Sequence, residues 1–271
     1  MSLQNSINDV SEIKKIVADS SGKLINVTIS GSHLYGFESV DSDIDYRGTL
    51  LIDTNKLLGI HTPKDHITRE IGINDIVLFE LKKEINLLYK GNCNVLEHIF
   101  AKQLYTSDEY FELKKLVGLN LNINGLYNSY RGMAWENYNK FCRAGKHTVK
   151  KFLYVFRAQL AGIHVMNTRS IEPNINVLLE TPYTFDISLI KELVKLKRNG
   201  KEKDLLEDEI GSKCHGLVTA LFTHMDVLYE KVKPSERLER DLDHQREKYF
   251  DKFLKKIRKN YILRIEKDSS Q

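Results

Sequence analysis

The stretch from residue 27 to residue 51, VTISGSHLYGFESVDSDIDYRGTLL, constrains the fold of this chain most. It begins with the β-branched run Val27–Ile29, which is typical of a strand and ends at a Ser-Gly-Ser turn. An acidic cluster around Asp43 and Asp45 then opens a second β-like run, Tyr46–Ile52. The pattern predicts a strand, a phosphate-holding turn with a helix start, and a second strand that carries metal ligands.

Two features of this stretch suit phosphate and metal chemistry. Asp43 and Asp45 are two residues apart, so on a strand both side chains would point to the same face, with Cα atoms about 6–7 Å apart. Such a pair can share divalent ions, and Mg²⁺ (or Mn²⁺) is expected because it takes oxygen ligands. Upstream, Gly31 lets the backbone approach an anion closely, and Ser32 offers a hydroxyl at the start of the next helix.

Two other motifs are excluded at named positions. A calcium-binding EF-hand loop needs glycine and glutamate where this chain has Tyr46 and Ile52. A P-loop needs Lys-Ser/Thr where this chain has Phe37 and Glu38. An isolated Asp-x-Asp pair is also common in solvated turns, so the preceding strand and Gly-Ser turn are what favour a functional site.

The remaining pattern predicts an α+β fold, with a small mixed β-sheet flanked by helices and followed by a mostly α-helical C-terminal domain. The strands are expected near residues 24–29, 46–52 and 75–80, while residues 53–69 are expected to form a loop. Helical periodicity dominates after about residue 107. We therefore divide the chain into domains at residues 1–115 and 116–271.

Composition limits the class of protein. Of the 271 residues, 41% are hydrophobic, which is enough for a packed core, and the net charge of +4 permits an anionic partner without requiring one. Cys93, Cys142 and Cys214 are far apart, which indicates neither a disulfide framework nor a cysteine zinc site and favours a reduced, cytoplasmic setting. We expect no signal peptide, because the N-terminus lacks the pattern, and no membrane segment.

The motif residues also carry a family resemblance. The Gly-Ser pair, the gap, and Asp-Ile-Asp followed by Tyr-Arg-Gly resemble the signature of the polymerase-β-type nucleotidyltransferase superfamily. More narrowly, GSHLYGFESVDSDIDYRG resembles the nucleotidyltransferases of the RNA-ligase-associated polymerase-β-like family, and the resemblance continues in DIVLFELKKEINLLYKGNCNVLEHIF and KKFLYVFRAQLAGIHV. It covers most of residues 24–180. Cys93 stands where proline is usual, which affects a turn rather than the metal site.

This resemblance implies roles for the motif residues. Gly31–Ser32 would bind the nucleotide phosphates, and Asp43 and Asp45 would bind the metals. A third carboxylate, acting as general base or metal ligand, comes from a later strand, and we assign it to Asp75. Glu80 is the alternative. On an alternating strand the two residues would face opposite ways, so only one of them can serve.

Further nucleotide-binding residues are expected on the second strand and on one helix. Arg47 would share the face of Asp45 and either contact phosphates or neutralise the acidic cluster. Lys150, Tyr154 and Arg157 recur at helical spacing with Lys151 beside them, so they could grip a triphosphate and stack on a base. The alternative for these four residues is a solvated helix face next to a core stripe.

These observations predict a metal-dependent nucleotidyltransferase. It would transfer a nucleoside monophosphate from an NTP to a hydroxyl acceptor and release pyrophosphate. An RNA 3′ end is one candidate acceptor, while a protein hydroxyl and a small molecule are others. The alternative is a non-catalytic nucleotide-binding protein that retains the fold.

Overall fold

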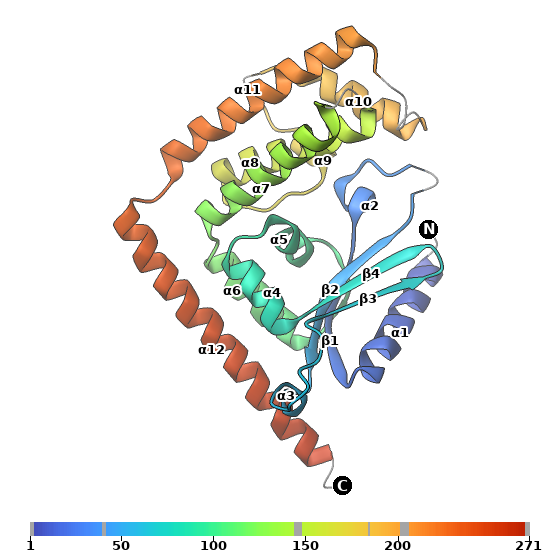
Figure 1. Ribbon diagram of the computed structural model, residues 1–271, viewed down its shortest axis with the longest axis vertical. Coiled ribbons are helices and arrows are strands. Elements are labelled where there is room, and N and C mark those ends of the chain that lie inside the picture. The colour runs from blue at the N-terminus through green and yellow to red at the C-terminus, as the bar shows by residue number, and fades with distance from the viewer. Residues whose placement is uncertain (1–2, 40–41, 144–147, 184, 201–205, 269–271) are drawn as a thin grey trace.

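A five-stranded mixed sheet forms the centre of the N-terminal part of the computed structural model (Figure 1), which describes residues 3–39, 42–143, 148–183, 185–200 and 206–268. The strand order is β3-β4-β2-β1-β5. β2 and β4 are parallel, and the other neighbouring pairs are antiparallel. The strands are β1 Gly22–Ser30, β2 Asp45–Ile52, β3 His66–Ile71, β4 Asn74–Glu80 and β5 Gln103–Thr106.

The predicted α+β class and three of the strands are confirmed: β1, β2 and β4 form where the sequence predicts them. The prediction of a loop over residues 53–69 is wrong at both ends, since α3 (Thr54–Leu57) and β3 lie there. β3 is polar and pairs with β4 alone at the sheet edge, so it lacks the apolar alternation of a buried strand. β5, four residues long, escapes prediction for lack of any pattern of useful length.

Helices cover both faces of the sheet and then form a separate layer (Figure 1). The helices that accompany the sheet are α1 Leu3–Asp19, α2 Gly31–Tyr35, α3, α4 Leu81–Tyr89, α5 Cys93–Phe100 and α6 Asp108–Leu119. The helices of the C-terminal part are α7 Ile123–Asn137, the π-helical turn η1 Tyr138–Cys142, α8 Val149–Thr168, α9 Ile175–Leu178, α10 Ser188–Arg198, α11 Asp208–Val232 and α12 Glu236–Asp268.

Strand alternation divides the core between the two faces of the sheet. Leu50 and Ile52 on β2 belong to the same buried cluster as Ile13 and Val17 of α1. Leu51, between them, belongs to the larger cluster under the helices on the other face. The alternation explains why one short run of apolar residues supports two layers.

The helical part shares its core with the sheet. The larger cluster extends from Ile25 of β1 to Ile257 of α12. α12 lies back along the first half of the molecule (Figure 1), where Tyr89 donates a hydrogen bond to Asp243 at 2.9 Å and Arg258 donates to the Ile52 carbonyl at 2.8 Å. The domain division at residue 115 therefore stays a prediction. Among the described residues, no helix is both long and apolar enough to cross a bilayer.

Candidate active site

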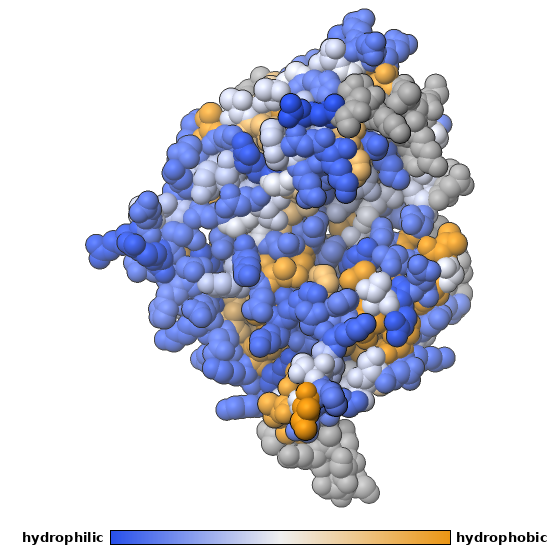
Figure 2. Space-filling view, in the orientation of Figure 1, coloured by the Kyte–Doolittle hydropathy of each residue, from blue (hydrophilic) through white to orange (hydrophobic). Residues whose placement is uncertain are grey.

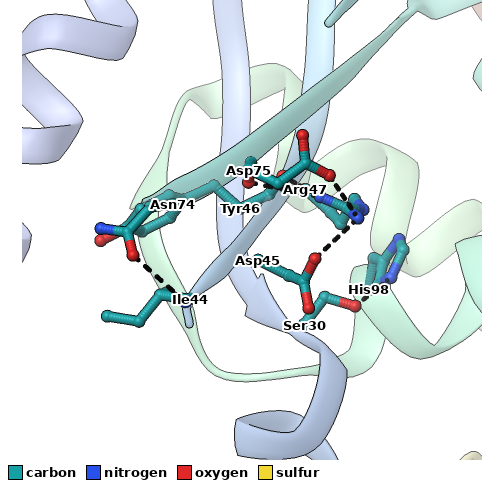
Figure 3. A network of polar contacts seen from close by, with 8 residues as sticks. All are labelled: Ser30, Ile44, Asp45, Tyr46, Arg47, Asn74, Asp75 and His98. Atoms are coloured by element: carbon teal, nitrogen blue, oxygen red, sulfur yellow. Dashed lines mark hydrogen bonds and ion pairs between the residues drawn. The ribbon is translucent and has the colours of Figure 1, made fainter. Parts of the chain in front are cut away.

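Two carboxylates lie opposite each other where the parallel strands β2 and β4 begin. Asp45 pairs with Asp75 in the register of these strands. Arg47, on the same face as Asp45, donates from Nη2 to Asp45 Oδ1 at 2.9 Å and to Asp75 Oδ2 at 3.1 Å. Figure 3 shows the three side chains pointing toward one another. The guanidinium balances two carboxylates that would otherwise repel each other.

The Gly31 turn lies directly beneath Asp45. Gly31 has a φ of +63°, which favours glycine, and a Cβ built there would stand 2.0 Å from Asp45 Oδ2. Only a residue without a side chain allows the carboxylate to approach the turn this closely. Two independent requirements therefore explain the glycine at this position: the positive φ of the backbone and the close approach of Asp45.

Ser30 and His98 form a second polar pair beside the carboxylates (Figure 3). Ser30 Oγ lies 2.9 Å from His98 Nε2, and Gln103 donates to the His98 carbonyl at 2.8 Å. Burial, followed by the positive charges of Arg47 and Arg157, lowers the pKa of His98 to about 3. The imidazole is therefore neutral near pH 7 and can exchange one hydrogen bond with the hydroxyl of Ser30.

A network of hydrogen bonds fixes the starts of β2 and β4, which carry the two carboxylates. The backbone N–H of Ile44 donates to Asn74 Oδ1 at 3.2 Å, and the N–H of Asp75 donates to the Ile44 carbonyl at 3.1 Å. On the same side, the Tyr46 hydroxyl donates to Asp9 of α1. These contacts join the start of β2 to the start of β4, so Asp45 and Asp75 are held by backbone as well as by Arg47.

A cavity of about 610 Å³ opens over this site. Gly31, Asp45, Arg47 and Tyr154 line it, so four residues that the sequence singles out meet at one hollow. Asp75 is not among the lining residues, and it contacts the lining through Arg47. Ser32, Lys150 and Lys151 are not among the lining residues, and their predicted role in nucleotide binding stays a prediction.

The predicted helical face of α8 is divided between two environments. Tyr154 packs edge-on against the rings of Tyr35 and Phe37, with centroid distances of 5.9 and 5.3 Å. Lys150 is exposed, and the Lys151 ammonium lies 5.1 Å from the ring centre of Phe141. Of the four residues predicted on this helix to bind the nucleotide, only Tyr154 lines the cavity.

Arg157 requires a correction, because the expectation of an accessible guanidinium is wrong. Its side chain is 1% exposed, forms an ion pair with Glu97 of α5, and lies 3.9 Å from the centre of the Tyr35 ring. Burial raises the pKa of Glu97, and the charge of Arg157 acts against that rise. The guanidinium therefore binds the two halves of the chain together, and it does not reach the cavity.

Asp43 and Glu80 also lie differently from a simple strand pattern. β2 begins at Asp45, so Asp43 is an exposed residue of the preceding loop and the shared strand face is not formed. Glu80 lies at the opposite end of β4 from Asp75, is 5% exposed, caps α4 and forms an ion pair with Arg258. Asp75, rather than Glu80, is the residue beside Asp45.

The donor set of the site is chemically suited to a hard divalent cation. Carboxylate oxygens are the ligands that Mg²⁺ prefers, and Arg47 uses one oxygen of each carboxylate. In the part of the chain that the structure describes, no group of three or more His, Cys, Asp or Glu side chains is arranged to hold a metal ion. The carboxylates of Asp45 and Asp75 are in place, while Asp43, the other predicted metal ligand, lies in the loop before β2.

Several cavity residues escaped the sequence analysis. His98 has no spacing that indicates a role, and its partner Ser30 is 68 residues away. Lys83, Asn92 and Asn94 also line the cavity, although they lie in stretches used only for the resemblance. Of these, Ser30 carried a signal, because it directly precedes the Gly31 turn.

A family model and several known proteins match this chain. The chain matches the model of the RNA repair pathway DNA polymerase beta family over residues 6–253. An uncharacterized protein of Methanocaldococcus jannaschii is 29% identical over 185 residues, covering 66% of this chain and 75% of that protein. One of Bacillus subtilis is 28% identical over 204 residues, covering 72% and 78%. The crystal structure of a nucleotidyltransferase-like protein from Exiguobacterium sibiricum aligns with a TM-score of 0.30 and 10% identity, covering 83% of this chain and 75% of that one.

Proposed function

Since the chain belongs to the RNA repair pathway DNA polymerase beta family, which supports nucleotidyltransferase activity in general, we propose that it transfers a nucleoside monophosphate from an NTP to a hydroxyl acceptor. The observation that carries this proposal is the pairing of Asp45 with Asp75 over the Gly31 turn, at the wall of a cavity. A binding protein has no need of two aligned carboxylates. An enzyme that assembles cations around a triphosphate does.

Asp45 and Asp75 would hold a divalent cation, Mg²⁺ or Mn²⁺, with Asp43 brought in from its loop. Such a cation neutralises charge on the triphosphate and on the leaving group. Arg47 lies between the two carboxylates. We therefore infer that its guanidinium moves onto the substrate phosphates when the cation binds, which unites its two predicted roles.

The chain's own groups then perform the transfer. The Gly31–Ser32 turn and Arg47 hold the triphosphate, and Tyr154 packs against the base. The acceptor oxygen attacks the α-phosphorus, the bond from that phosphorus to the bridging oxygen breaks, and pyrophosphate leaves with the electron pair. Asp75 takes the acceptor proton as general base or acts as a ligand of the cation. The neutral His98 fixes Ser30 at the edge of the turn.

The acceptor class is supported by the family alone. The family description refers to an RNA repair pathway, which favours an RNA 3′ end over a protein hydroxyl or a small molecule. ATP is one candidate donor among the four NTPs, and the test compares them.

The test is pyrophosphate release from each NTP, with RNA and with the protein itself as acceptors, in Mg²⁺ or Mn²⁺. We expect Asp45→Asn and Asp75→Asn each to lower the rate at least about a hundredfold. Glu80→Gln should retain activity, and Asp19→Asn, an exposed change on α1, serves as the matched control. Turnover that survives Asp45→Asn would overturn the mechanism. Nucleotide binding without turnover under every condition would favour the non-catalytic alternative.

A further inference from the structure

A second cavity, larger than the one over Asp45, lies outside the candidate active site. It has a volume of about 780 Å³ and lies between α4, α12 and the segment around α3. Lys83 and Leu87, one helical turn apart on α4, line both this cavity and the one over Asp45. A chain-like ligand in the α4–α12 cavity could therefore extend into the candidate active site across a single turn of helix.

The lining of the α4–α12 cavity is strongly basic. Each of its three acidic residues is paired with a basic residue of the same lining: Glu80 with Arg258, Asp65 with Lys83 at 3.0 Å, and Asp251 with Lys255 at 2.6 Å. The remaining basic residues are Lys64, Lys82, Lys90 and Lys259, and they are exposed. Within the described part of the chain, their ammonium groups have no ion-pair partner. The lining therefore has four more basic than acidic residues, which equals the net charge of +4 of the whole chain.

An ion pair between Arg258 of α12 and Glu80, which caps α4, connects the two helices that line this cavity. Arg258, 12% exposed, binds Glu80 and the Ile52 carbonyl and so fixes α12 against the sheet. Lys82 and Lys90 are separated by about 12 Å along the axis of α4. A row of anions fits this spacing better than a single phosphate does.

One side of the rim is apolar. Leu58 is 79% exposed and lines the cavity, and Figure 2 shows hydrophobic residues gathered beside α3 at the lower end of the molecule. A ligand that combines regularly spaced negative charges with flat apolar groups would use both kinds of surface. A nucleic acid strand has both.

We propose that the α4–α12 cavity binds the phosphate backbone of a single-stranded nucleic acid. The terminal hydroxyl of that strand then passes Lys83 and Leu87 to reach Asp45. This inference rests on the proposed function and adds where the acceptor lies. A single-stranded nucleic acid suits the geometry because it is flexible enough to bend around the helical turn of α4 that separates the two cavities.

The test measures binding of a short fluorescein-labelled single-stranded RNA by fluorescence anisotropy, without NTP or divalent cation. Each lysine–phosphate contact contributes about fivefold to the affinity at 0.1 M salt. We therefore expect Lys90→Glu/Lys259→Glu to weaken binding at least about 25-fold and to reduce the salt dependence, log K against log salt, by roughly 0.7 per lost contact. Lys191→Glu/Lys195→Glu, the same charge change on exposed positions of α10, should bind as wild type does. Thermal unfolding confirms that both double variants fold.

Three results of the binding experiment would overturn the inference: no RNA binding by the wild type, equal weakening by both double variants, or displacement of the RNA by poly-glutamate of equal charge. The last would assign the cavity to an acidic peptide. Parallel titrations with single-stranded DNA show which sugar is preferred. Asp45→Asn separates this inference from the proposed function, because it should lose transfer and retain RNA binding. Transfer to RNA with an unchanged KM in Lys90→Glu/Lys259→Glu would leave the function standing and exclude the cavity.

Discussion

Arg47 supplies the counter-charge of the two carboxylates that we propose to bind a cation. Its guanidinium contacts both Asp45 and Asp75, so Arg47→Gln leaves two neighbouring carboxylates without their counter-charge. Because all three side chains are partly exposed, we expect a loss of only about 1 kcal/mol of unfolding free energy in EDTA. Added Mg²⁺ should raise the unfolding temperature of this variant more than that of the wild type.

The control for this prediction is Arg69→Gln on the exposed edge strand β3, where the guanidinium donates to the Thr68 carbonyl of its own strand at 3.0 Å. It should respond to Mg²⁺ as the wild type does. An equal Mg²⁺ effect in all three proteins, measured by thermal unfolding, would mean that Arg47 and cations do not compete.

Gly31 must adopt a positive φ and must also leave room for Asp45, whereas Gly72 has only the requirement for a positive φ. Both have positive φ, +63° and +61°, but a Cβ at Gly72 meets nothing within 4 Å, whereas at Gly31 it meets Asp45. We expect each Gly→Ala change to cost about 1 kcal/mol of unfolding free energy for the backbone alone. Gly31→Ala should in addition displace Asp45 and abolish pyrophosphate release, while Gly72→Ala retains it. Equal activity of both variants would contradict a close packing of the turn against the carboxylate.

Single residues also show why the site was only partly predictable. Asp45 and Arg47 could be placed together because they lie two residues apart on one strand. Arg157 could not, since its partner Glu97 is 60 residues away and a helical pattern does not reveal which polar residue finds a buried counter-charge. The role of His98 depends in the same way on Ser30, from a different element.

At the level of elements, the approach of α7 to the end of α4 depends on a glycine. A Cβ at Gly125 would stand 2.0 Å from the Lys90 carbonyl, while one at Gly132 of the same helix meets nothing within 4 Å. Gly132→Ala should stabilise the protein by about 0.5–1 kcal/mol through helix propensity. Gly125→Ala should instead destabilise it by about 2 kcal/mol or more, because backbone must move. Urea denaturation measures both, and stabilisation by Gly125→Ala would contradict the packing.

The same scale explains what the sequence could predict of the fold. β1, β2 and β4 are central strands with apolar faces, so their composition alone indicated them. β3 and β5 occupy the two edges of the sheet, where one side pairs and little is buried, so no pattern marked them. Periodicity thus reveals elements that bury a face and misses those that merely complete a sheet.

For the whole molecule, two buried groups couple stability to pH with opposite signs. Burial, then the charges of Arg47 and Arg157, lowers the pKa of His98 to about 3, and burial raises that of Glu84 to about 8 against an opposing hydrogen bond from Thr49. The His98 contribution is present above the unfolded pKa of about 6.5 and is lost as pH falls toward 3. The Glu84 contribution is present below the unfolded pKa of about 4.3 and is lost as pH rises through 8.

Between about pH 4.3 and 6.5 the two contributions change with pH at nearly equal and opposite rates, so their slopes cancel. From about pH 6.5 to 8 only the contribution of Glu84 changes. We therefore expect Glu84→Gln to remove a decline of about 1 kcal/mol per pH unit in this upper range, and His98→Gln to remove a rise of similar slope below about pH 6.5. Urea denaturation across the pH range measures both slopes. Glu136→Gln, an exposed change on α7, should leave the profile unchanged. A Glu84→Gln profile parallel to that of the wild type between about pH 6.5 and 8 would show that this carboxyl is ionised in the folded protein near neutral pH, and would contradict its raised pKa.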